Sequence, residues 1–386
     1  MRPLKKLRVV LLSTLFVLGI SSCEVSRTLR FGALPSQKDY AHFPQRKIEN
    51  QGPAFNFSKP NVEYNLGSSI GLTNRSLNST NVKLDSFVTL HNTIAFLIIR
   101  NDTILYQKYN DKYVDTSLVS SFSMVKPMIS TLIGIAISEG LIQSVDNSIT
   151  DYLSEYKNKA GFDCITIKNL LQHTSGIKFT DDDFNLVSDN AEFYRGNDLR
   201  KELTELTLKT SPNIEFHYSS ANTQLLALII ERVTNKPISN YLETKIWKPL
   251  GMESPAFWSL DSDGKNSMEK AFCCLQARPI DFAKFGRLYL NKGVWEGKQI
   301  VPKDWVEYST HSDPNNPNNV NRHFYNNNWG IGPLKYNSFY AVGLYGQYLY
   351  VYPEKNIQII RFGNSSVFYN PNYWQDIFIQ IIDQLN

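Results

Sequence analysis

The chain has 386 residues, of which 42% are hydrophobic and 20% are charged, so it is long enough for a sizeable core and has a globular composition. Its formal net charge of +4 comes from the first residues, because four basic residues and no acidic residue precede Cys23. From Cys23 onward 36 basic residues balance 36 acidic ones, which gives no reason to expect a nucleic acid partner.

Residues 1–22 are predicted to be a lipoprotein signal peptide. A basic start is followed by an apolar run, Val9 to Ile20, which is too short to span a membrane comfortably. The run ends in Ile20-Ser21-Ser22-Cys23, which resembles a bacterial lipobox with Cys23 as the lipidated residue. We therefore expect an exported protein that faces the periplasm or the cell surface and contacts the membrane through this lipid only. An ordinary secretory signal or an uncleaved anchor are the alternatives.

Residues 23–85 are rich in Asn, Ser, Pro and Gln and lack sustained periodicity, which predicts a tether and an irregular arm, partly packed on the domain. The cysteines after Cys23 are odd in number: Cys164, Cys273 and Cys274. Adjacent cysteines are an awkward pair, so no disulfide framework is expected, and their spacing does not suit zinc.

Residues 86–386 are predicted to form one domain. Thr93 to Arg100 and Thr103 to Tyr109 have the pattern of a β-hairpin around Asn101-Asp102. Helical spacing follows at 165–173, 221–234, 279–290 and 302–308, and the chain ends with strands at 345–351 and 356–362 and a helix at 371–385. This order predicts an α/β (α+β) fold, an antiparallel sheet flanked by helices with an inserted, mostly helical subdomain. The Asn-rich stretch 311–328 is either a lid or a disordered surface loop.

The pattern Ser-x-x-Lys can place a hydroxyl beside an amine at the start of a helix. It occurs five times, at Ser123/Lys126, Ser154/Lys157, Ser175/Lys178, Ser262/Lys265 and Ser267/Lys270. Only the first match opens a long apolar segment, which continues to Glu139-Gly140 and is expected to be a buried helix. A desolvated Lys126 could then take the proton of Ser123, although a solvated Lys beside an ordinary Ser has the same spacing.

Three further motifs are arranged as in a known family. Leu170–Ile177 resembles the LLxHTSG(L/I) signature of serine β-lactamase-related hydrolases, and Phe216–Asn222 resembles their Tyr-x-Asn element. Ala341–Gln347 lies where the family has Lys-Thr-Gly or His-x-Gly. Over residues 85–385 the chain thus resembles a class C β-lactamase or penicillin-binding-protein-like hydrolase. It is most similar to the 6-aminohexanoate-dimer hydrolase and esterase-like branch.

The resemblance implies a role for each matching residue. Ser123 would be the nucleophile, Lys126 the base and Tyr218 the relay that passes a proton to the leaving group. The backbone N–H groups of Ser123 and Leu344 would form the oxyanion hole, and Gly343 and Ser220 would lie beside the substrate. Neither a metal nor a cofactor is expected. His173 is expected to be structural, and Asp181-Asp182-Asp183 to be a solvated loop near the site entrance rather than a metal cluster.

The chain departs from the family pattern at Ser220, Ala341 and Val342, where the family has Asn, a cation and a small polar residue. Losing the cation removes a charge-assisted contact to a substrate carboxylate. We therefore predict a small-molecule amide or ester substrate, in an apolar site supplied from Trp329, Tyr336, Phe339, Tyr340 and Tyr345. Because side chains alternate along a strand, some of these aromatics are expected in the core. A β-lactamase or DD-peptidase, and a catalytically silent ligand-binding module, are the alternatives.

Overall fold

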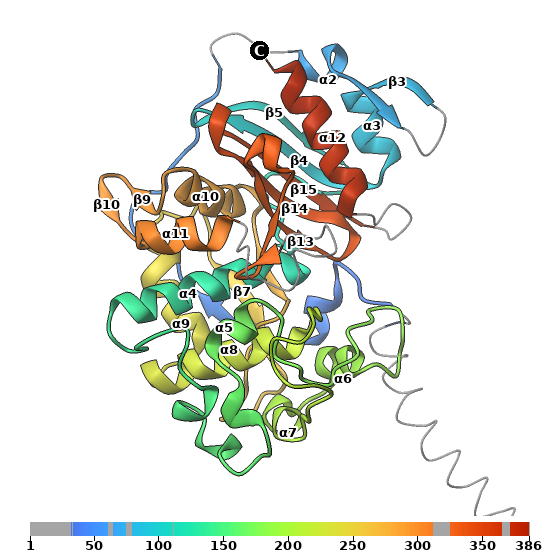
Figure 1. Cartoon of the computed structure of the whole chain (residues 1–386). Helices are drawn as coiled ribbons and strands as arrows, with labels where there is room; N and C mark the ends of the chain where they lie inside the picture. Colours follow the sequence, from blue (N-terminus) through green and yellow to red (C-terminus); the bar gives the residue numbers. More distant parts are fainter. Residues whose placement is uncertain are drawn as a thin grey trace, which may run out of the picture.

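A seven-stranded antiparallel sheet forms the upper part of the molecule in Figure 1. The computed structural model describes residues 32, 34–60, 65–74, 79–110, 112–311, 325–364 and 371–385. In spatial order the strands are β11 (Tyr325–Asn326), β12 (Trp329–Ile331), β13 (Phe339–Gly343), β14 (Gln347–Tyr352), β15 (Ile357–Gly363), β4 (Thr93–Arg100) and β5 (Thr103–Tyr109). The predicted hairpin of β4 and β5 is confirmed, and β15, from near the end of the chain, pairs with β4 on the side away from the edge strand β5.

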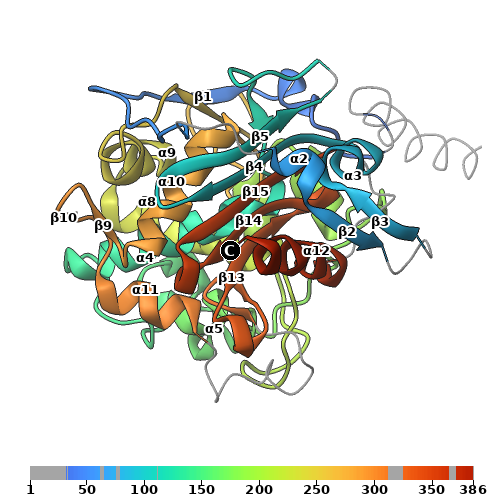
Figure 2. The ribbon, with the colours of Figure 1, turned by 90° about the horizontal axis from the view of Figure 1, so that it is seen from above.

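Helices cover both faces of this sheet. On one face α3 (Leu84–Leu90) and α12 (Pro371–Gln384) bury a cluster that includes Phe87, Trp374 and Phe378 (Figure 2). On the other face α10 (Pro279–Leu290) packs against β14 and β15. The alternating side chains of β4 divide between the two layers, since Phe96 and Ile98 join the first cluster while Leu97 and Ile99 join the larger core.

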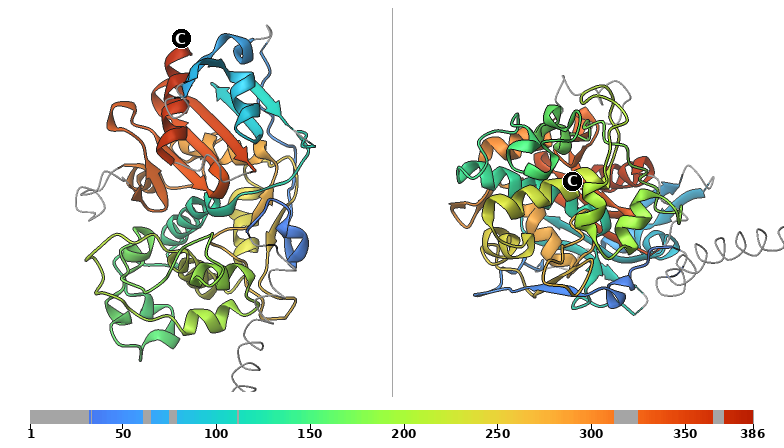
Figure 3. Two further views of the ribbon diagram at one scale, coloured as in Figure 1. Left: turned by 90° about the vertical axis from the view of Figure 1, so that its right-hand side faces the viewer. Right: turned by 90° about the horizontal axis from the view of Figure 1, so that it is seen from below.

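The helical region between β5 and β11 lies below the sheet in Figure 1, and the left view of Figure 3 shows the two parts one above the other. Its helices are α4 (Lys126–Ser138), α5 (Ile167–Leu171), α6 (Asp189–Arg195), α7 (Leu199–Thr204), α8 (Ser220–Thr234), α9 (Ile238–Leu242) with a π-turn at Glu243–Trp247, α10 and α11 (Lys303–Thr310). The central helix α4 is buried from Lys126 to Ala136, as predicted. In the part of the chain that the structure describes, no helix has the length and apolar character needed to cross a membrane.

The predicted irregular arm contains more regular structure than its composition indicates. Gln45–Ile48 forms β1, which pairs with β7 (Ala256–Ser259) in a second sheet that continues through β8 (Leu275–Ala277) to β6 (Val119–Ser120). Leu66–Ser69 forms α2, and Gly71–Asn74 (β2) pairs antiparallel with Ser79–Lys83 (β3). The prediction of an irregular arm is wrong for these residues, and its boundary at residue 85 falls inside α3. A further small hairpin is formed by β9 (Val294–Trp295) and β10 (Lys298–Gln299).

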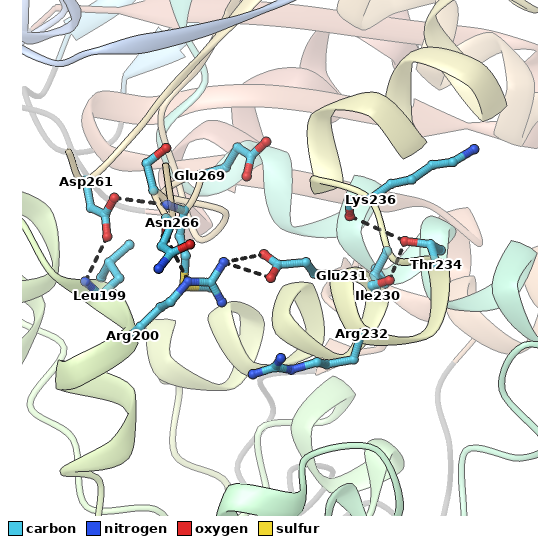
Figure 4. Close-up of polar contacts among 12 residues, drawn as sticks. Leu199, Arg200, Ile230, Glu231, Arg232, Thr234, Lys236, Asp261, Asn266 and Glu269 are labelled. Atoms are coloured by element: carbon cyan, nitrogen blue, oxygen red, sulfur yellow. Dashed lines mark hydrogen bonds and ion pairs between the residues drawn. The ribbon is translucent and has the colours of Figure 1, made fainter. Parts of the chain in front are cut away.

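An ion pair joins α7 to α8, and hydrogen bonds join α7 to the loop around Asp261 and Asn266 (Figure 4). Arg200 donates from Nη2 to both carboxylate oxygens of Glu231, at 2.7 and 2.9 Å, and from Nε to the carbonyl of Asn266. Asp261 accepts from the N–H of Leu199, the first residue of α7. These contacts fix the start of α7 against α8, the helix whose first turn carries Ser220 of the candidate site.

Candidate active site

The turn that holds Ser123 is positioned by β8 of the second sheet and by Tyr345, which follows β13. Ser121 donates its N–H to the carbonyl of Leu275 at 2.9 Å, and a 3-10 turn at Phe122–Val125 then leads into α4. Phe122 has φ +44°, a left-handed conformation that a bulky residue rarely adopts without a constraint. Its ring packs edge-on against Tyr345, which has φ +65°, so two strained aromatic residues fix each other beside the half-buried Ser123.

Lys126 is buried, with 1% of its surface exposed, and its ammonium has three neighbouring oxygen atoms. Nζ lies 3.2 Å from Ser123 Oγ, 3.1 Å from Ser220 Oγ and 3.0 Å from the carbonyl of Phe272. Burial lowers the pKa of Lys126 to about 8, while the charges of Asp181 and Asp183 act in the opposite direction. An amine with this pKa is partly neutral near pH 8 and can accept a proton from a hydroxyl.

The other Ser-x-x-Lys matches differ from this arrangement. Lys157, Lys178 and Lys265 are exposed, so their amines remain solvated. Lys270 is buried, but its Nζ donates to the carbonyls of Phe193 and Gly196. Burial and proximity to a hydroxyl therefore distinguish the pair of Ser123 and Lys126.

The end of β13 approaches the Ser123 turn closely. A Cβ on Gly343 would lie 2.4 Å from the carbonyl oxygen of Ser121 and 3.2 Å from the backbone nitrogen of Ser123, so only glycine fits. Leu344 follows directly, at the start of a 3-10 turn, and is buried. The first N–H groups of a helical turn have no partner within it, so the backbone of Ser123 and Leu344 can offer donors to an oxyanion.

Tyr218 lies beside Lys126 and packs against the rings of His173 and Tyr325, of which the sequence had not indicated Tyr325. Lys126 Nζ is 4.9 Å from the centroid of the Tyr218 ring, which stacks on His173 at 4.9 Å and meets the edge of Tyr325. The buried His173 accepts the N–H of Ser219 at its Nδ1, at 2.9 Å. Burial and the charge of Lys126 lower the pKa of His173 to about 3, so a neutral imidazole positions the residues around Tyr218, the structural role expected for it.

Ser220 and Asp181 complete the surroundings of Lys126. Ser220 begins α8, and its N–H donates to Asp181 Oδ2 at 2.5 Å. Burial raises the pKa of Asp181, and the charge of Lys126 lowers it. The prediction of a solvated acidic loop is therefore wrong for Asp181, although its neighbour Asp182 is exposed. A run of three aspartates gives no sequence signal that two of them, Asp181 and Asp183, are half-buried.

Phe272, whose carbonyl accepts from Lys126, is followed by a disulfide bond between the adjacent Cys273 and Cys274. The bond joins neighbouring residues and links no distant segments, so it does not form a disulfide framework. Trp258 Nε1 donates to the carbonyl of Cys273 at 3.0 Å. The segment that presents the Phe272 carbonyl is thus tied to the second sheet.

Four of the five aromatic residues that were expected to line the site lie elsewhere. Trp329 and Phe339 are in the core with Tyr289, because these positions of β12 and β13 face the helical layer. Tyr340 stacks on Tyr350 on the opposite face, and Tyr336 meets Tyr352 edge-on. Only Tyr345 lies beside the Ser123 turn. Ala341 is buried in the larger core, and Val342 packs on the opposite face of β13.

A profile of the beta-lactamase family matches residues 90–377, which include every residue of this site. The chain belongs to the beta-lactamase family. It is a serine hydrolase of the serine beta-lactamase and penicillin-binding-protein-like family, in which relatives are named as hydrolases. The 6-aminohexanoate-dimer hydrolase of Paenarthrobacter ureafaciens is 26% identical over 287 residues, which are 70% of this chain and 72% of that protein.

Solved structures of two other beta-lactamase-like proteins share the fold. A Bacillus anthracis protein whose structure is named for 6-aminohexanoate-dimer hydrolase superimposes with a TM-score of 0.80 at 22% identity, covering 92% of this chain and 93% of that one. The octameric penicillin-binding protein homologue from Pyrococcus abyssi superimposes with a TM-score of 0.57 at 20% identity, covering 77% and 76%. The predicted β-lactamase-like α/β fold is thus confirmed.

Proposed function

We propose that this protein is an exported serine hydrolase that cleaves an amide or ester bond through an acyl-enzyme, with Ser123, Lys126 and Tyr218 as its catalytic residues. The observation that carries the proposal is the buried Lys126 amine 3.2 Å from Ser123 Oγ, with its pKa lowered to about 8 by burial. A binding module has no need of a desolvated amine next to a hydroxyl, so this pair favours an enzyme.

The reaction has two stages. Ser123 Oγ attacks the substrate carbonyl as its proton moves to Lys126 Nζ, and the oxyanion accepts hydrogen bonds from the N–H groups of Ser123 and Leu344. When the carbonyl re-forms, the bond to the amine or alkoxide breaks, and Tyr218 delivers its proton to that leaving group and takes one from Lys126, so both side chains return to their starting state. Water then attacks the acyl-enzyme as it gives a proton to Lys126, and collapse of this second intermediate returns that proton to Ser123 Oγ and releases the carboxylic acid.

The charges around Lys126 disfavour a substrate carboxylate. Ala341 replaces the cation of the family pattern, and both Asp181 and Asp183 act on Lys126 with negative charge. We therefore expect p-nitrophenyl acetate and butyrate, and uncharged or ω-amino acyl amides, to have higher kcat/KM values than penicillins or the cephalosporin nitrocefin. The 6-aminohexanoate dimer is an amide to include, because a relative is named for it.

The measurement compares kcat/KM for these esters, amides and nitrocefin at one pH, with Ser123→Ala as the background. A higher kcat/KM for nitrocefin than for both esters would contradict the proposed substrate class and favour the β-lactamase alternative. A ligand-binding module would show no Ser123-dependent turnover of any of them.

Export and lipid attachment are part of the same proposal. The signal peptide, Cys23 and the start of the tether lie outside the described residues, so their support is the lipobox resemblance. Farther along the arm, Gln37 exchanges hydrogen bonds with the backbone N–H and carbonyl of Ser120, at 2.8 and 3.2 Å, and Tyr345 donates its hydroxyl to the carbonyl of Pro35. Shortened chains must therefore keep residue 35 onward to preserve the Ser123 turn.

A chain that begins at residue 30 should stay in solution without detergent and retain its esterase activity. Full-length protein expressed in bacteria should incorporate labelled palmitate and sediment with membranes, whereas Cys23→Ala should lose the label. Membrane sedimentation of the shortened chain would instead point to a membrane contact besides the lipid.

A further inference from the structure

The hydrogen bonds of Lys126 restrict how its amine can act as a base. A charged ammonium has three protons, one for each of the oxygens at Ser123 Oγ, Ser220 Oγ and the Phe272 carbonyl. A neutral amine has two protons and a lone pair. The lone pair must face Ser123 to accept its proton, so both remaining N–H groups must donate to Ser220 and Phe272.

Of these two acceptors, only Ser220 can adopt the wrong orientation. The Phe272 carbonyl can only accept, whereas a serine hydroxyl both donates and accepts. If the Ser220 O–H pointed at Lys126, it would occupy the lone pair that Ser123 needs. Something must therefore direct the Ser220 proton away from the amine.

Asp181 is the group in position to do this. The N–H of Ser220 donates to Asp181 Oδ2 at 2.5 Å, which brings the carboxylate within reach of the hydroxyl of the same residue. When Asp181 is ionised it has no proton to donate, so in that state the Ser220 hydroxyl is the donor to it. The Ser220 lone pairs then face Lys126, whose N–H they accept.

We propose that Asp181 is a positioning residue of this hydrolase, which acts through the Ser220 hydroxyl to hold the lone pair of Lys126 toward Ser123. The inference rests on the proposed Ser123 and Lys126 mechanism. When the Ser123 proton reaches Lys126, the ammonium so formed donates to Ser220 and Phe272, and the nearby negative charge of Asp181 stabilises it. Asp181, whose loop is distant in sequence from Ser220, thus takes over part of the role of the Asn that the Tyr-x-Asn pattern has in place of Ser220.

The neighbouring charges fix the direction of the expected pH effect. Lys126 faces Asp181 and Asp183, which raise its pKa against the stronger effect of burial. Asp181 also faces His217, while the nearby His173 stays neutral because its pKa is lowered to about 3. Removing the charge of Asp181 leaves burial and Asp183, so the pKa of Lys126 must fall. A reaction that needs neutral Lys126 then begins at lower pH.

The test measures the second-order rate of labelling by a fluorophosphonate between pH 5.5 and 10, which requires no knowledge of the natural substrate. We compare the wild type with Asp181→Asn, Ser220→Ala and the double variant. Asp181→Asn retains an acceptor for the Ser220 N–H, so it is expected to fold. In Asp181→Asn the labelling rate should begin to rise at a pH lower by about one unit. Its plateau rate should fall roughly tenfold or more, because the Lys126 lone pair is no longer held toward Ser123. The double variant should be no slower than Ser220→Ala alone.

Asp182→Asn is the matched control, because Asp182 is exposed and adjacent in the same loop. Its pH profile should coincide with that of the wild type. An unshifted pH profile in Asp181→Asn, or additive losses in the double variant, would overturn the proposal. Failure of the wild type to be labelled would instead contradict the proposed serine hydrolase mechanism, so the two failures are distinguishable.

Discussion

Replacing Ser123 with Ala should lower kcat/KM for p-nitrophenyl butyrate by roughly 10⁴-fold or more, because the acyl-enzyme can no longer form. The change removes one hydroxyl from a half-buried position, whose hydrogen bond to Lys126 is worth about 1 kcal/mol in stability. Thermal unfolding and circular dichroism should therefore stay close to those of the wild type. Steady-state kinetics on the two proteins provide the measurement.

Ser154→Ala is the control for this loss. Ser154 also precedes a lysine by three residues, but both Ser154 and Lys157 are exposed. Its kcat/KM should equal the wild-type value. Retention of more than a few per cent of activity in Ser123→Ala, after purification from contaminating esterases, would contradict the assignment of the nucleophile.

Lys126→Arg should be almost as damaging, with a loss of about 10³-fold or more in kcat/KM, although it keeps a positive charge. A guanidinium stays protonated across the accessible pH range, so it cannot take the proton of Ser123. In the wild type, kcat/KM should rise with pH through about pH 8 as Lys126 loses its proton. The pH profile and the activity of the variant are measured with the same ester.

Lys126→Arg can also lower the stability of the fold, because the residue is buried and its three acceptors are fitted to an ammonium. A folding check by circular dichroism therefore accompanies the kinetics. The sign of the pH effect supplies an independent readout. Substantial activity in a folded Lys126→Arg protein, or a wild-type rate that falls as pH rises from 7 to 8.5, would exclude Lys126 as the base.

Sequence periodicity predicted the elements whose apolar positions repeat over a long stretch. α8, α10 and α12 lie where helical spacing indicated them, and β14 and β15 follow the predicted strands within two residues. β1 was missed because Gln45–Ile48 is short and mostly polar, and its strand conformation depends on pairing with residues about 210 positions later. Local pattern cannot reveal such a partner.

For the candidate site too, residues in local motifs were predicted and residues placed by tertiary contacts were not. Ser123, Lys126 and Tyr218 were identified because they belong to motifs with fixed local spacing, and the structure brings all three together. Asp181 was assigned to solvent because only a tertiary contact, with the start of α8, turns its side chain inward. Trp329 and its aromatic neighbours were placed at the site by sequence proximity, whereas the alternation of the strands directs them to the core and the opposite face. Residues 312–324 of the Asn-rich stretch lie outside the described residues.

The central claim is that the fold makes Ser123 covalently reactive through Lys126. It is tested most directly by treating the folded wild-type protein with a fluorophosphonate and mapping the adduct by peptide mass spectrometry. We expect one adduct, on the peptide that contains Ser123, and none in denatured protein or in Lys126→Arg. An adduct on another serine, or no adduct in folded protein at pH 8.5, would contradict the account.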